Sequence, residues 1–227
     1  KFGSLPFEKL IEPAIKLAGN GVVVTKKQAK QLNRFKSKFR EANKRTILLD
    51  KDWQTGDTIK YLKLAETLKR IKTNGRDEFY KGKTADILVE QVQKLGGIIT
   101  KEDLANYEAQ WRDPITFMYK AHKIISMPPP SSGGICIAQI LKSIAPYNIE
   151  HYAHNSTEYI QLIVEAERRA YADRSYFLGD PDFVNIPTDS LMSEHYLSKR
   201  MADFDWEKAT QSSTLSRGSI PGYESDE

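Results

Sequence analysis

The stretch MPPPSSGGICIAQIL, residues 127–141, places three prolines, two serines and two glycines directly ahead of an apolar run. In residues 114–127, apolar side chains alternate with polar ones, and this period predicts a β-hairpin. Proline has no amide hydrogen for a sheet ladder, so residues 128–130 end the second strand. The apolar run after the glycines predicts a helix. The stretch therefore predicts an α/β chain in which a hairpin leads directly into a helix.

The two serines, Ser131 and Ser132, admit three interpretations: a catalytic elbow, an anion-binding loop or a helix start. A serine elbow needs the pattern G-x-S-x-G, whereas here Gly133 and Gly134 come only after the serines. A phosphate loop needs a lysine beside the glycine pair, and Ile135 follows instead. We therefore expect either serine to cap the helix, and the glycines to allow a close approach of the backbone.

Helical periodicity dominates the rest of the chain, so the segment is helix-rich with one hairpin. Thr25 with Gln28, and Thr100 with Asp103, have the spacing of capping boxes that open helices. Apolar stripes at helical spacing lie in residues 10–18, 29–39, 62–71, 85–92, 104–107, 135–141 and 159–170.

The clearest helix follows Asn155, which has the spacing of a cap with Glu158. Glu165 and Arg169 lie one turn apart within it, a spacing that brings opposite charges together. Gly179 is expected to end the helix.

A charged cluster stands at the end of this helix, formed by Asp173, Arg174, Asp180 and Asp182. Catalytic carboxylates need a partner acid or base, and the sequence indicates none nearby. We therefore interpret the cluster as a structural ion pair that supports the turn.

Composition is that of an ordinary globular protein. The chain has 227 residues, enough for one domain or two small ones, with 40% apolar and 28% charged residues. Its net charge of +4 requires no acidic partner. No apolar run is long enough to span a bilayer.

Metal ligands are sparse. Cys136 is the single cysteine, which excludes a disulfide within the chain and a cysteine-rich metal site. Of the four histidines, His122 and His195 are isolated, and His151 and His154 lie three residues apart with no third ligand indicated. We expect no metal site.

Residues 26–45 carry nine basic residues against one acidic residue, Glu41. Such a run can bind nucleic acid. However, Phe35 and Phe39 fall at helical spacing among the lysines, as on a solvated helix face. We expect a solvated face and no nucleic-acid partner.

Four stretches carry a family resemblance: residues 96–115 (GGIITKEDLANYEAQWRDPI), 127–141, 166–183 (AERRAYADRSYFLGDPDF) and 222–227 (GYESDE). In this order they resemble the heavy subunit of bacterial gamma-glutamyltranspeptidases, through essentially the whole chain. Cephalosporin acylases and capsule-releasing relatives share the scaffold.

The resemblance implies an N-terminal-nucleophile hydrolase fold, an αββα sandwich built jointly by two subunits. It implies a precursor that cuts itself, after which the N-terminal threonine of the light subunit is the nucleophile and its α-amine the base. The implied reaction is attack on a γ-glutamyl amide such as glutathione, which forms a γ-glutamyl ester that water or an amino acid resolves. No metal or organic cofactor is implied.

The resemblance also implies where the cut falls, directly after Glu227. The nucleophile is then the next residue, so no catalytic residue is expected in residues 1–227. The arginine that clamps the substrate carboxylate is expected upstream of Lys1, and the oxyanion donors in the light subunit. Both ends of the chain have the character of cuts within a longer polypeptide.

On this interpretation residues 1–227 form a single segment of one N-terminal-nucleophile hydrolase domain, with residues 206–227 a flexible pre-cleavage tail. A structural motif is expected at Ser131, Ser132, Gly133, Gly134, Asp173 and Arg174. The implied partners are the light subunit and a small γ-glutamyl substrate, and the implied location is periplasmic or secreted. An acylase acting on another amide and a non-catalytic scaffold protein are the alternatives.

Overall fold

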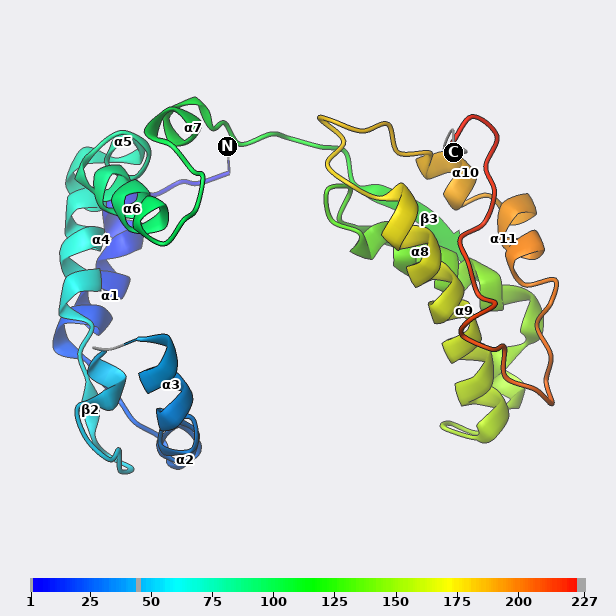
Figure 1. Cartoon of the computed structure of the whole chain (residues 1–227), viewed down its shortest axis with the longest axis horizontal. Helices are drawn as coiled ribbons and strands as arrows, with labels where there is room; N and C mark the ends of the chain where they lie inside the picture. The colour runs from blue at the N-terminus through cyan, green and yellow to red at the C-terminus, as the bar shows by residue number, and fades with distance from the viewer. Residues whose placement is uncertain (1, 44–45, 224–227) are drawn as a thin grey trace. The chain divides into compact units, whose positions relative to one another are not determined.

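The structure is a computed structural model that describes residues 2–43 and 46–223. It divides into two compact units, Lys1–Ala109 and Gln110–Glu227 (Figure 1). Each unit has buried apolar clusters of its own. That both units belong to one hydrolase domain stays a prediction.

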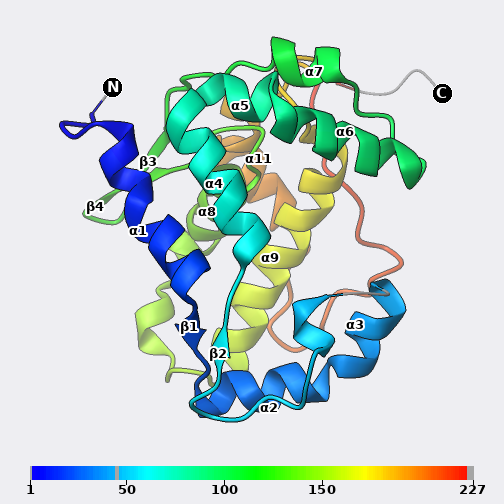
Figure 2. The same ribbon diagram turned by 90° about the vertical axis from the view of Figure 1, so that its left-hand side faces the viewer.

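Unit 1 is built mainly of helices. Its elements are α1 (Phe7–Asn20), β1 (Val22–Val23), α2 (Lys26–Arg34), α3 (Lys36–Ala42), the 3₁₀ turn η1 (Ile47–Leu49), β2 (Thr58–Ile59), α4 (Leu62–Asn74), α5 (Arg76–Tyr80), α6 (Lys83–Lys94) and α7 (Lys101–Asn106). Helices α1 and α4 pack side by side, and β1 pairs antiparallel with β2 below them (Figure 2). Both predicted capping boxes are confirmed, at the starts of α2 and α7.

Trp53 packs with Val24, Ala29 and Ile59 in a small buried core of unit 1. The amide group of Asn33 exchanges two hydrogen bonds of 2.9 Å with the backbone of Trp53. These bonds satisfy polar groups that the burial of the loop takes out of water. They tie the loop before β2 to helix α2.

Unit 2 begins with the predicted hairpin. Its elements are β3 (Ile115–Tyr119), β4 (His122–Ser126), α8 (Gly133–Ile144), the 3₁₀ turns η2 (Ala145–Tyr147) and η3 (Ile149–His151), α9 (Thr157–Phe177), α10 (Thr188–Leu191) and α11 (Glu194–Arg200). The strands pair antiparallel from Ile115 opposite Ser126 to Tyr119 opposite His122, which confirms the hairpin expected near 114–127.

Helix α8 is the central element of unit 2, because it packs against the hairpin, α9, α10 and α11. Ile135 and Ala138 on α8 are completely buried, and Phe117 and Phe177 pack in the same cluster. The start of α8 lies directly against the hairpin. A Cβ atom at Gly134 would be 2.3 Å from the backbone oxygen of Met127. Only glycine allows this approach.

Two predicted helix caps are wrong in detail. Ser156 caps α9, not Asn155, because the Ser156 hydroxyl accepts a hydrogen bond of 3.3 Å from the Tyr159 N–H. Ser132 occupies the cap position of α8 but makes no capping hydrogen bond with its side chain. The hydroxyl of Ser131 instead accepts a bond of 3.3 Å from the Gly133 N–H.

The close approach at Gly134 yields a stability prediction. Gly134→Ala should lower the free energy of unfolding by about 1–3 kcal/mol, because the new methyl group overpacks the contact with Met127. Gly133→Ala is the matched control, since its Cβ would meet only the Ser131 hydroxyl oxygen, at 3.6 Å. Thermal and urea unfolding of both variants checks this. Equal stabilities would contradict the packing described here.

Candidate functional site: a buried charged stripe and the segment it holds

Helix α9 carries three buried charged residues on one face. Glu165, Arg169 and Asp173 are spaced by four residues, so they lie one above the other along the helix. Their exposed fractions are 2%, 2% and 1%. A buried charge is costly unless it is paired and hydrogen-bonded. The partners of these three side chains therefore define the site.

Four donors converge on the Asp173 carboxylate. One oxygen accepts from the Gln139 amide at 3.1 Å and from the Tyr196 hydroxyl at 2.9 Å. The other accepts from the Gly218 backbone N–H at 2.8 Å and pairs with the Arg200 guanidinium at 3.1 Å. Burial and the nearby Asp173 charge raise the pKa of Tyr196, so its hydroxyl stays a donor. The carboxylate thus joins α8, α9, α11 and the chain at Gly218.

The guanidinium of Arg169 is also fully engaged. It pairs with the Glu165 carboxylate, with Asp203 at 2.7 Å, and donates to the Thr210 hydroxyl at 3.2 Å. It also donates to the backbone oxygen of Arg200 at 2.7 Å. Glu165 in turn accepts from the Thr210 N–H at 3.1 Å. This cluster holds residues 203–210 against α9.

We call residues 203–223 the C-terminal segment, drawn in orange to red in Figure 1, where it runs along α9 and α11. Beyond Thr210 it is held at several points. The backbone oxygen of Ser216 accepts from Arg200 at 2.8 Å. The side chain of Ile220 is buried in the main core of unit 2. The Tyr223 oxygen accepts from the Tyr176 hydroxyl at 3.2 Å.

The sequence predicts a flexible tail over 206–227, and this flexibility stays a prediction. In the structure, residues 206–223 contact the rest of unit 2 through hydrogen bonds of Thr210 and Gly218 and through the buried side chain of Ile220. The predicted cleavage position, Glu227, lies outside the described residues.

The structural motif proposed from the sequence lies at the start of α8. The Arg174 Nε donates to the Ser132 hydroxyl at 2.8 Å. Arginine keeps its proton in proteins and cannot serve as a general base. The Ser132 hydroxyl thus lies beside a permanent cation, which cannot activate it as a nucleophile. The structural role of these serines and of Gly133 stays a proposal.

The expected ion pair at the end of α9 has different partners. Asp173 pairs with Arg200, while Arg174 points to Ser132. Adjacent residues on a helix point in directions about 100° apart, so Asp173 and Arg174 do not face each other. Asp182 pairs with Arg112 at 2.6 Å.

Other candidate reactive groups lack an activating environment. Cys136 is buried, and burial raises the pKa of its thiol, so the reactive thiolate is disfavoured.

Across residues 2–43 and 46–223, no group of three or more His, Cys, Asp or Glu side chains could hold a metal ion. Within the same ranges, no helix has the length and apolar character that crossing a membrane requires.

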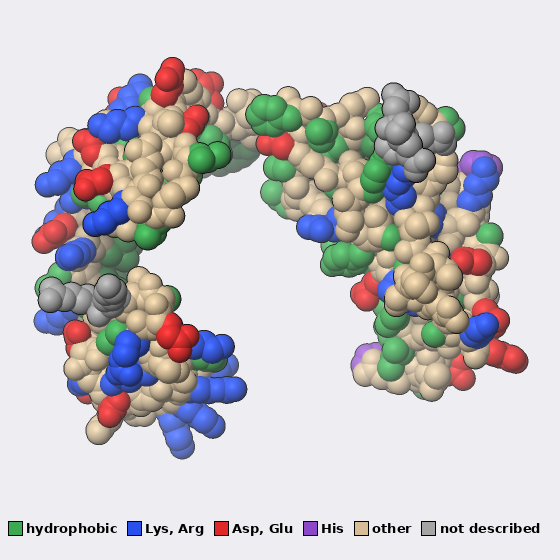
Figure 3. Space-filling view, viewed as in Figure 1, with side chains coloured by type: hydrophobic (Ala, Val, Ile, Leu, Met, Phe, Trp, Pro, Cys, Tyr) green, Lys and Arg blue, Asp and Glu red, His purple; other side chains and the backbone are tan. Residues whose placement is uncertain are grey.

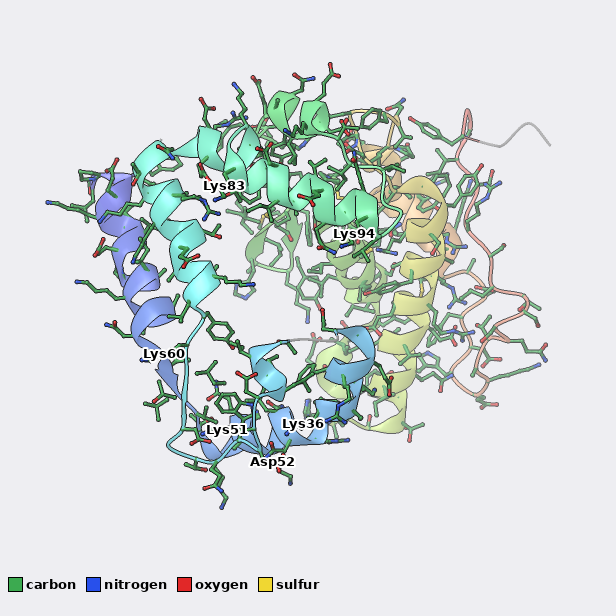
Figure 4. The ribbon with its side chains drawn as sticks, turned by 60° about the vertical axis from the view of Figure 1, so that its left-hand side comes forward. Lys36, Lys51, Asp52, Lys60, Lys83 and Lys94 are labelled. Carbon is green, nitrogen blue, oxygen red and sulfur yellow. The ribbon has the colours of Figure 1, made fainter. Side chains whose placement is uncertain are left out.

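The basic run covers α2 and α3, where Lys and Arg side chains project into solvent (Figure 3). Part of it is paired: Lys36 and Asp52 form an ion pair of 2.7 Å, labelled in Figure 4. Arg34 and Lys38 lie over the Phe35 ring, 5.4 and 5.7 Å from its centroid. Residues 44 and 45 lie outside the described residues. The absence of a nucleic-acid partner stays a prediction.

The sequence pattern does not single out Gln139, Tyr196, Arg200 or Gly218 as partners of Asp173. One signal was available. Tyr196 and Arg200 are four residues apart on α11, which matches the spacing of Glu165, Arg169 and Asp173 on α9. A polar stripe on each of two helices indicates that the stripes face each other.

Loss of the Asp173 charge should destabilise unit 2. Asp173→Asn leaves the partly buried Arg200 guanidinium without its counter-charge and should cost about 3 kcal/mol in the free energy of unfolding. Glu167→Gln is the control, because Glu167 lies exposed on the same helix. Urea unfolding followed by circular dichroism measures both. A cost for Asp173→Asn no larger than that of the control would contradict the central role of this carboxylate.

The Glu165 carboxylate should make stability depend on pH. Burial by itself raises its pKa, but hydrogen bonds from Thr210 and Arg169 outweigh burial and hold the pKa below its ordinary value of 4.5. A depressed pKa stabilises the fold above the ordinary value, and that stability is lost as the pH falls through the folded pKa. The difference in melting temperature between wild type and Glu165→Gln should therefore be largest at neutral pH and shrink as the pH falls below the ordinary value of 4.5. A difference that does not change with pH would contradict this assignment.

Comparison with known proteins places this arrangement in a family. The model of the family described as gamma-glutamyltranspeptidase matches residues 1–226. The glutathione hydrolase proenzyme of Escherichia coli (strain K12) is 41% identical over 231 residues, which cover 100% of this chain and 40% of that protein. The acylase ACY 1 proenzyme of Pseudomonas sp. (strain SE83) is 35% identical, over 92% of this chain and 38% of that protein. The chain thus spans about two fifths of the length of these relatives.

A solved structure of the same family has the same fold as this chain. The crystal structure of Helicobacter pylori gamma-glutamyltranspeptidase matches with a TM-score of 0.87 and 38% identity, over 100% of this chain and 66% of that one. This match confirms the predicted fold class, a helix-rich part of an N-terminal-nucleophile hydrolase. The chain belongs to the gamma-glutamyltranspeptidase family.

Proposed function

We propose that this chain is the C-terminal portion of the heavy subunit of a γ-glutamyl transferase and hydrolase. One observation carries the proposal: the family model matches residues 1–226, almost the entire chain. The relatives named glutathione hydrolase proenzyme support γ-glutamyl amides such as glutathione as the substrate class. The partner is the light subunit cut from the same precursor, and the location is periplasmic or secreted.

The precursor cuts itself after Glu227. The hydroxyl of the next residue attacks the Glu227 carbonyl carbon, the C–N bond breaks, and the nitrogen takes a proton and becomes the new N-terminal amine. Water then cleaves the resulting ester, which yields the Glu227 carboxylate and restores the hydroxyl. The word proenzyme in the relatives' names supports this processing.

The mature enzyme uses the new N-terminal hydroxyl as its nucleophile. The hydroxyl oxygen attacks the γ-glutamyl carbonyl carbon, the α-amine takes the hydroxyl proton, and the leaving amine receives it. Water or an amino acid then resolves the γ-glutamyl ester. The described part of this chain serves as scaffold in this scheme, with Ser131, Ser132, Gly133, Gly134, Asp173 and Arg174 as structural residues, and no metal, organic cofactor or nucleic acid takes part.

An acylase of the same fold is the second candidate. The 35% identity to an acylase proenzyme favours it as the alternative. The two activities differ in the acyl group, because a γ-glutamyl group carries an α-amine and an α-carboxylate, whereas a glutaryl group has no α-amine. Rates on a γ-glutamyl anilide and on a glutaryl amide therefore separate them. A protein inactive on both, and uncut, would be a non-catalytic scaffold.

The processing prediction is tested on the whole reading frame. Expression of the full precursor should yield two fragments, and the intact mass of the first should end at Glu227. Replacing the residue encoded after Glu227 with alanine should leave one uncut, inactive polypeptide, because alanine has no hydroxyl to attack the carbonyl. The processed protein should turn over the γ-glutamyl anilide faster than the glutaryl amide.

The alanine variant separates self-cleavage from a host protease. Continued cleavage after Glu227 in that variant would show that another enzyme makes the cut. Faster turnover of the glutaryl amide by the processed wild type would favour the acylase.

A further inference from the structure

We propose that Asp173 and Gly218 are positioning residues for precursor cleavage: their contact fixes the course of the chain that leads to Glu227. The inference rests on the proposed self-cleavage and deepens it. The Asp173 side chain on α9 is only 1% exposed. Its carboxylate accepts a hydrogen bond of 2.8 Å from the N–H of Gly218, which lies 45 residues further along the chain.

The contact has two points. The Gly218 N–H donates to Asp173, and two residues earlier the Ser216 oxygen accepts from Arg200 at 2.8 Å. Arg200 and Asp173 are themselves paired at 3.1 Å. One ion pair, between buried Asp173 and partly buried Arg200, therefore binds the backbone at the Gly218 N–H and at the Ser216 oxygen. Hydrogen bonds to charged groups are stronger than neutral ones, so this hold is firm.

The position of Gly218 leaves no room for a side chain. A Cβ atom there would lie 2.3 Å from the Tyr196 hydroxyl oxygen and 2.7 Å from the Arg200 Cδ. Both neighbours are also partners of Asp173, so they cannot move away without loss of those bonds. Glycine at 218 is thus a requirement of the contact, and its backbone conformation is an ordinary one with no left-handed φ.

A second contact fixes the chain closer to the cleavage position. The backbone oxygen of Tyr223 accepts a hydrogen bond of 3.2 Å from the Tyr176 hydroxyl. The Arg217 guanidinium lies 3.6 Å from the centroid of the Tyr176 ring. Glu227 stands four positions after Tyr223, and four residues of extended chain span at most about 14 Å.

The rate of cleavage depends on how closely the attacking hydroxyl and the Glu227 carbonyl carbon are placed. A hydroxyl attacks a carbonyl carbon at a useful rate only when the two atoms are held near their reacting distance, and a misplacement of about 1 Å costs roughly 100-fold in rate. With the chain held at Gly218 and Tyr223, the start of the path to Glu227 is set before the reaction. Displacement of Gly218 from Asp173 shifts that starting point.

The experiment follows cleavage of the whole precursor. Wild type and Gly218→Ala are made in a cell-free system, translation is stopped, and intact masses are recorded over time. Gly218→Ala should be cut about 100-fold more slowly. The fraction that is eventually cut should turn over a γ-glutamyl anilide with an unchanged kcat, a split that general destabilisation would not produce. Gly97→Ala is the matched control, since its Cβ would lie 2.4 Å from Val92 in unit 1, and it should be cut at the wild-type rate.

Tyr176→Phe keeps the test decisive if Gly218→Ala does not fold. It removes only one hydroxyl, on a side chain that is 42% exposed, and leaves the ring under Arg217 in place. Loss of the hydrogen bond to Tyr223 should slow cleavage about threefold to tenfold.

The outcomes separate this inference from the proposed function. Wild-type precursor that stays uncut, or that is cut even with alanine after Glu227, would overturn self-cleavage itself. Wild-type precursor that cuts itself while Tyr176→Phe and folded Gly218→Ala are cut at the same rate would overturn the positioning role alone.

Discussion

Burial of charge along one face of α9 is the constraint on which unit 2 depends. A helix buries an apolar face at little cost, but Glu165, Arg169 and Asp173 each need partners once water is excluded. The helix itself supplies only the pairing of Glu165 with Arg168 and Arg169. Every other partner comes from elsewhere: Gln139 on α8, Tyr196 and Arg200 on α11, and the backbone and side chains of residues 203–218. The order of unit 2 follows from meeting these demands.

The same demand explains why a polar, turn-rich stretch can be well placed without being a helix or a strand. In residues 203–223, Ile220 is buried and Phe204, Trp206 and Tyr223 pack partly buried against the cores of unit 2. The described part of the segment has no helix or strand. Its backbone groups bond instead to charged side chains of α9 and α11. Hydrogen bonds of this kind give a fixed course to a chain whose composition alone favours mobility.

The sequence predicted those parts of the fold that depend on contacts between residues close together in the chain. The hairpin at 115–126 and the capping boxes at Thr25 and Thr100 depend on residues within a few positions of one another. The contact of Asp173 with Gly218 joins residues 45 apart, and no period of the sequence encodes such a distance. Prediction failed for the same reason at Arg174, whose neighbour in sequence, Asp173, is not its partner in space. The family resemblance supplied the fold class but not these contacts.

The buried thiol of Cys136 has a consequence for redox chemistry. Disulfide exchange proceeds through attack of a thiolate on a disulfide sulfur, which releases the other sulfur as a thiolate, and its rate falls when the attacking thiol is protonated and covered. Cys136 is enclosed in α8, and burial raises its pKa. A covered, protonated thiol is a poor nucleophile, so mixed disulfides with small molecules are disfavoured at Cys136.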